Sequence, residues 1–76
     1  MGQVLSLPFS GKRLRELRER RGWSQTEFAR IVDVHQSRIS QLENARTRPM
    51  PGLLKAMALA LEVEIDDLLA PQDGES

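Results

Sequence analysis

A short polar stretch, residues 36–44, has residue types and spacing that suit hydrogen bonding to DNA bases. If it is helical and Ile39 faces the core, side chains turn by about 100° per residue. The side away from Ile39 then carries uncharged polar groups: Ser37, Ser40, Gln41 and Asn44. Glutamine can bind adenine bidentately, and short side chains let a helix enter a major groove closely. We therefore predict that Gln36, Ser37 and Gln41 read bases, with Gln36 in the first helical turn.

Basic and polar residues around this face are candidates for binding the phosphate backbone. Gln25 can aim both the N-terminus of a preceding helix and its own amide at a phosphate group. Arg38 flanks the base-reading face and could contact either a base or a phosphate. The predicted phosphate-binding set is Gln25, Arg38, Ser40, Asn44, Arg46 and Arg48. A merely solvated helix face is the competing interpretation, and the surrounding arginines favour the DNA interpretation over it.

Two short helices must position these residues. Phe28, Ala29 and Val32 form one apolar stripe with helical spacing, and Ile39 and Leu42 form a second. Residues 33–35 between the stripes allow only a tight turn. We expect the small Ala29 side chain where the two helices cross closely.

Capping signals predict where the first two helices begin and end. Ser10 is the expected N-cap of the first helix, and Gly22 supplies the left-handed residue that ends it. Ser24 and Glu27 form a capping box that starts the second helix. Trp23, beside this start, is expected in the core and not as a base-stacking platform.

Two turns need residues with a positive φ, and two prolines mark further helix boundaries. Asp33 stands where the tight turn needs a positive φ, which aspartate tolerates at some cost. At the end of the polar stretch 36–44, either Asn44 or Ala45 must take the left-handed conformation. Pro51 suits the first turn of a fourth helix, and Pro71 should stop a short fifth one.

The charge distribution is strongly asymmetric although the net charge is zero. Residues 12–55 hold all eleven lysines and arginines against five acidic residues, whereas residues 56–76 hold six acidic residues and no basic one. This segregation indicates a basic face toward a polyanion and an acidic face away from it.

Length and composition predict one small domain. The chain has 76 residues and no cysteine, so neither a disulfide nor a thiolate metal site can supplement the core. No apolar run is long enough for a membrane span, and a soluble cytoplasmic protein is the expectation. His35 is the lone histidine and has no metal-ligating companion, so we predict neither a metal nor a cofactor.

The whole pattern resembles the helix-turn-helix of phage repressor and Cro-like regulators. The similar segments follow in the family's order: SQTEFARIV, SRISQLENARTRP and LLKAMALALEVEIDDLL. The resemblance implies an all-α fold, a compact five-helix bundle of the lambda-repressor-like class. We expect an N-terminal arm over residues 1–10, the DNA-binding domain over residues 11–70 and a polar tail over residues 71–76.

The same resemblance carries functional expectations. It places base contacts at Gln36, Ser37 and Gln41, and it implies a structural ion pair between Arg18 and Glu43 that joins the first and third helices. Members of this family usually bind double-stranded DNA as two-fold dimers. The expected function is therefore a sequence-specific transcriptional regulator, a repressor or controller protein, that acts as a homodimer.

Two other classes of function compete with a transcriptional regulator. An antitoxin that binds a protein toxin as well as DNA is the alternative, since antitoxins also use this fold. An enzyme is disfavoured, because the sequence has no cysteine, no Ser-His-Asp spacing and no glycine-rich phosphate loop. The paired carboxylates Asp66 and Asp67 suit a helix start.

Overall fold

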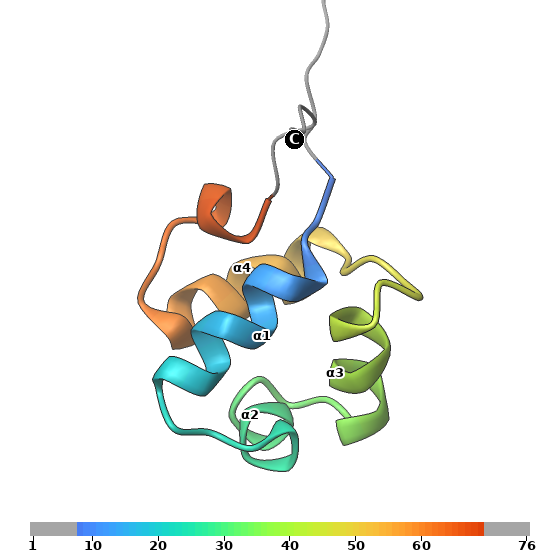
Figure 1. Ribbon diagram of the computed structural model, residues 1–76, viewed down its shortest axis with the longest axis vertical. Coiled ribbons are helices and arrows are strands. Elements are labelled where there is room, and N and C mark those ends of the chain that lie inside the picture. The colour runs from blue at the N-terminus through green and yellow to red at the C-terminus, as the bar shows by residue number, and fades with distance from the viewer. Residues whose placement is uncertain (1–7, 70–76) are drawn as a thin grey trace, which may run out of the picture.

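The structure, a computed structural model, describes residues 8–69, and the regular elements in that range are all helices (Figure 1). Most of the expected arm and the whole expected tail lie outside the described residues. The elements in chain order are α1 (Gly11–Arg20), α2 (Gln25–Ile31), α3 (Gln36–Glu43), α4 (Pro51–Leu61) and the 3-10 helix η1 (Ile65–Leu68). Within the described range no helix is long and apolar enough to cross a membrane.

The capping signals in the sequence act as predicted at the first two helices. The Ser10 hydroxyl accepts a hydrogen bond from the Arg13 amide at 3.1 Å, which satisfies a free donor in the first turn of α1. Gly22 has a φ of 76° after the end of α1. The Ser24 hydroxyl accepts from the Glu27 amide at 3.0 Å, and the Glu27 carboxylate accepts from the Ser24 amide at 2.8 Å. These reciprocal bonds fix the start of α2.

Three turns use residues other than glycine in the left-handed conformation: Asp33 with φ 62°, Ala45 with φ 60° and Glu62 with φ 60°. Asp33 therefore takes the positive φ that the turn between α2 and α3 was predicted to need. After α3 it is Ala45, not Asn44, that is left-handed, because Asn44 has a φ of −93°. Each such residue costs stability relative to glycine, because its Cβ crowds the following carbonyl oxygen.

The core lies where all the elements meet. Its buried apolar side chains are Leu14, Phe28, Ala29, Val32, Ile39, Leu42, Met57, Ala58, Leu61 and Leu68. Trp23 packs against this cluster and stacks on Phe28 with ring centroids 5.9 Å apart, as expected of a core residue. Ala29 is buried on α2, and the α2–α3 contact is the most extensive between elements.

The fifth α-helix predicted from the sequence is wrong in type: the segment forms only η1, a single 3-10 turn. The reason lies in the residues that follow it. Leu69 is extended and forms an antiparallel bridge with Phe9, and the Leu68 carbonyl accepts a hydrogen bond from the Ser10 amide at 2.8 Å. The chain must leave the helix at once to make these bonds, so a full α-helical turn cannot form. The two ends of the described chain therefore lie side by side (Figure 1).

A glycine lets the start of α1 approach the end of α3. Gly11 is buried, and a Cβ at this position would lie 2.7 Å from the Glu43 carbonyl oxygen and closer still to that of Leu42. Only a residue without a side chain fits here. This contact sets the distance between α1 and the C-terminal end of α3.

Candidate nucleic-acid interface

The exposed side of α3 forms an open hollow. Its lining residues are Gln36, Ser37, Ser40, Gln41, Asn44 and Arg46. All three predicted base-reading residues belong to this hollow and are exposed, while Ile39 and Leu42 on the other side of α3 are fully buried. The hollow holds uncharged hydrogen-bonding groups along its length and one arginine at its C-terminal end.

Most of the predicted phosphate-binding residues lie in the hollow or beside the loop that follows α3. Ser40 and Asn44 lie within it, and the Asn44 amide donates to the Ser40 hydroxyl at 3.4 Å. Arg46 links it to a second hollow, lined by Pro8, Phe9, Ala45, Arg46, Thr47 and Arg48. Arg38 is half-buried and donates to the Arg48 carbonyl oxygen at 3.5 Å, so its guanidinium points toward the loop after α3.

Two arginines, one on α1 and one at its C-terminal end, form ion pairs with acidic side chains. Arg15 pairs with Glu19 at 3.3 Å on the exposed face of α1. Arg21 lies over the Trp23 ring and pairs with Glu62 at 3.4 Å. Arg38, Arg46 and Arg48 bring positive charge to the α3 hollow and to the loop that follows it.

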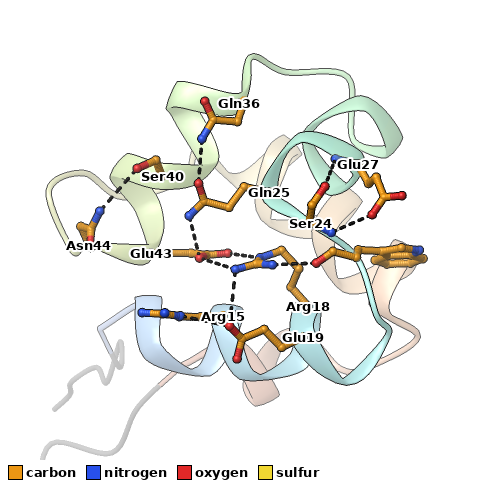
Figure 2. Close-up of polar contacts among 11 residues, drawn as sticks. Arg15, Arg18, Glu19, Ser24, Gln25, Glu27, Gln36, Ser40, Glu43 and Asn44 are labelled. Atoms are coloured by element: carbon orange, nitrogen blue, oxygen red, sulfur yellow. Dashed lines mark hydrogen bonds and ion pairs between the residues drawn. The ribbon is translucent and has the colours of Figure 1, made fainter.

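The predicted structural pair between Arg18 and Glu43 is present in the folded chain (Figure 2). Arg18 Nε donates to Glu43 Oε2 at 2.6 Å and Arg18 Nη2 to Glu43 Oε1 at 3.0 Å. Their side chains are only 8% and 2% exposed, so little solvent screens the pair. The hydrogen bond to Glu43 raises the pKa of Arg18, against the opposing effect of burial. Arg18 Nη1 also donates to the Trp23 carbonyl oxygen at 2.6 Å, which ties α1 to the start of α2.

A chain of side-chain hydrogen bonds connects this buried pair to the start of α3 (Figure 2). Gln25 Nε2 donates to Glu43 Oε1 at 3.0 Å, and Gln36 Nε2 donates to Gln25 Oε1 at 2.7 Å. Gln25, the predicted phosphate ligand, is half-buried at the first turn of α2. Among residues 8–69 only one of its two amide N–H groups has a hydrogen-bond partner.

Sequence reasoning missed two features of this region. It did not place Gln25 between Glu43 and Gln36, because the contact joins residues far apart in the chain. It also overlooked Gly11, although a glycine directly after the Ser10 cap was a visible sign of a close approach. Within residues 8–69 no cluster of three metal-ligating side chains occurs.

The chain belongs to the helix-turn-helix family, whose sequence model matches residues 14–68. This result confirms the family predicted from the sequence.

Two curated relatives and one solved structure illustrate the similarity. The HTH-type transcriptional regulator PrpR of Mycobacterium tuberculosis is 43% identical over 55 residues, which are 71% of this chain and 11% of that protein. The competence pilus inhibition repressor of Acinetobacter baylyi is 33% identical over 58 residues, 76% of this chain and 53% of that protein. The chain thus spans about half or less of the length of these two relatives. The P22 c2 repressor, solved with a synthetic operator, superimposes with a TM-score of 0.75 and 34% identity. That alignment covers 78% of this chain and 89% of the repressor chain.

Proposed function

We propose that this protein is a sequence-specific regulator of transcription that binds double-stranded DNA, acting as a repressor or controller protein. The observation that carries the proposal is the hollow on α3, which is lined by uncharged hydrogen-bonding side chains and by Arg46. A buried ion pair joins α3 to α1. The operator in the P22 c2 complex and the repressor names of the relatives support it and favour it over the antitoxin alternative. The proposal includes no catalytic activity.

In the proposed complex α3 enters the major groove with its hollow toward the base edges. Gln36, Ser37 and Gln41 read bases, because all three are exposed and line the hollow. Ser37 and Gln41 lie on the side of α3 opposite the buried Ile39, whereas Gln36 lies in the first turn. Gln36 can reach a base from the first turn, and Gln41 has the longest uncharged reach farther along the helix.

Phosphate groups are held on both sides of that groove. At one side Gln25 offers its free N–H and the N-terminus of α2. At the other side Ser40, Asn44, Arg46 and Arg48 lie at or beyond the C-terminal end of α3, with Arg38 next to the loop. These contacts supply affinity that does not depend on sequence.

The functional unit that we propose is a homodimer, since a single α3 contacts too few base pairs for a unique site. Leu59 is 69% exposed and Ile65 is 39% exposed, on the adjoining elements α4 and η1, and these apolar groups are the proposed contact between subunits. The proposed DNA-binding domain spans residues 11–70, with an arm over residues 1–10 and a tail over residues 71–76.

An electrophoretic mobility shift experiment tests the function directly. The protein is titrated against the DNA immediately upstream of its own gene and against a scrambled duplex of equal length. We expect tighter binding to the upstream DNA, as a complex of two protein chains per duplex. Equal affinity for both duplexes would contradict sequence-specific binding, and a complex with one chain would contradict the homodimer.

A further inference from the structure

Four side chains from three helices form one continuous series of hydrogen bonds (Figure 2). It begins at Arg18 on α1, passes through Glu43 at the end of α3 and Gln25 at the start of α2, and ends at Gln36 at the start of α3. The buried ion pair is thereby connected to Gln36, which lines the exposed hollow.

The direction of every bond in this series is set by the ion pair. Arg18 can only donate, and the Glu43 carboxylate that it contacts can only accept. Gln25 must therefore turn its NH₂ group toward Glu43, which leaves its carbonyl oxygen for Gln36. Gln36 must in turn direct its own NH₂ group toward Gln25. A reversed amide at either glutamine would place two donors or two acceptors against each other.

We propose that Glu43, held by Arg18, is a positioning residue that fixes the amide of Gln36 so that it favours adenine over guanine. This inference rests on the proposed function. With one N–H bound to Gln25, Gln36 presents its second N–H beside its carbonyl oxygen. Adenine offers a matching acceptor and donor, N7 and N6, in the major groove. Guanine offers two acceptors, N7 and O6, so its O6 would face the Gln36 carbonyl oxygen.

Glu43→Gln tests the inference, because it replaces the acceptor-only carboxylate by an amide that can also donate. Gln25 can then reverse, and Gln36 with it, so that the NH₂ group of Gln36 points outward. Selection from a pool of duplexes with randomised base pairs first gives the preferred sequence of the unaltered protein. The base pair whose preference disappears in Gln36→Ala is the one that Gln36 reads. Two duplexes are then titrated with each protein. They differ only at the base pair that Gln36 reads, where one has adenine and the other has guanine.

We expect the unaltered protein to prefer the adenine duplex by about tenfold, within the range for one bidentate contact. Glu43→Gln should reduce that ratio to about twofold or reverse it, while the preferences lost in Gln41→Ala stay intact. Unfolded protein raises both apparent dissociation constants by the same factor. The ratio of the two constants therefore does not depend on how much of the variant is folded. Glu16→Gln makes the same chemical change on the exposed face of α1 and should leave the ratio unchanged.

If Glu43→Gln does not fold, a second variant still tests the inference. Gln25→Leu leaves the Arg18–Glu43 pair in place but releases Gln36, and it should lower the adenine-to-guanine ratio to the same extent. An unchanged ratio in a folded Glu43→Gln or in Gln25→Leu overturns the inference, as does an unaltered protein that does not prefer adenine at the Gln36 base pair. If the unaltered protein selects no sequence from the pool, the proposed function itself fails.

Discussion

Replacing Arg18 by methionine should remove most of the stability of the domain. The change deletes three hydrogen bonds, two to the Glu43 carboxylate and one to the Trp23 carbonyl oxygen. Glu43 would keep only the bond from Gln25, with a side chain that is 2% exposed. Breaking a buried ion pair in this way costs about 3–5 kcal/mol. A domain of this size has a total stability of about the same magnitude, so Arg18→Met should be largely unfolded at 25 °C.

Urea unfolding followed by the helical circular dichroism signal measures this loss. The double variant Arg18→Met with Glu43→Leu removes both charges and should recover at least about 2 kcal/mol relative to Arg18→Met, because no unpaired carboxylate stays buried. Arg15→Met is the matched control: its ion pair with Glu19 is 62% and 56% exposed. It should change stability by less than about 1 kcal/mol. If Arg18→Met costs no more than this control, solvent reaches the Arg18–Glu43 pair and the argument from burial is wrong.

Four further predictions concern the turn after α3, the contact between α1 and α3, the exposed side of α3 and the effect of salt on binding. Ala45→Gly should stabilise the domain by about 1 kcal/mol in the same urea assay, because φ is 60° there, and an unchanged or lower midpoint would show that the turn carries no strain. Gly11→Ala should destabilise it by about 1–3 kcal/mol, because the added Cβ would meet the Leu42 and Glu43 carbonyl oxygens; a neutral effect would mean that α1 and α3 separate freely. Gln41→Ala should weaken binding to the selected duplex by about 1–3 kcal/mol without loss of folding, whereas Arg46→Ala should weaken cognate and scrambled duplexes alike. Binding should also weaken with salt, log K falling by about 0.9 per phosphate contact for each unit of log salt, and a slope near zero would exclude a phosphate-dominated interface.

Local sequence determined the helix boundaries around the helix-turn-helix. The bonds that start α2 join Ser24 to Glu27, three residues apart, and the left-handed turn at Gly22 depends on that residue alone. Such interactions are visible in any short window of the chain. The apolar spacing of Phe28, Ile39 and Leu42 likewise fixes which faces are buried and, by exclusion, which face of α3 remains exposed.

The sequence also narrowed the candidate interface, since helical periodicity alone separates the polar residues of α3 from its core residues. The base-reading and phosphate-binding roles of these residues remain predictions for the binding experiments. What periodicity cannot give is the direction of a side-chain amide, because that depends on partners from other helices.

Only the tertiary structure decided the remaining features, and each involves residues far apart in the chain. The segment 65–68 forms a 3-10 turn because Leu68 and Leu69 must meet Ser10 and Phe9, more than fifty residues earlier. The bond series from Arg18 to Gln36 needs α1, α2 and α3 to be packed before its members can touch. Local propensity acts over a few residues, whereas these contacts exist only once the core has closed, so no window of the sequence contains them.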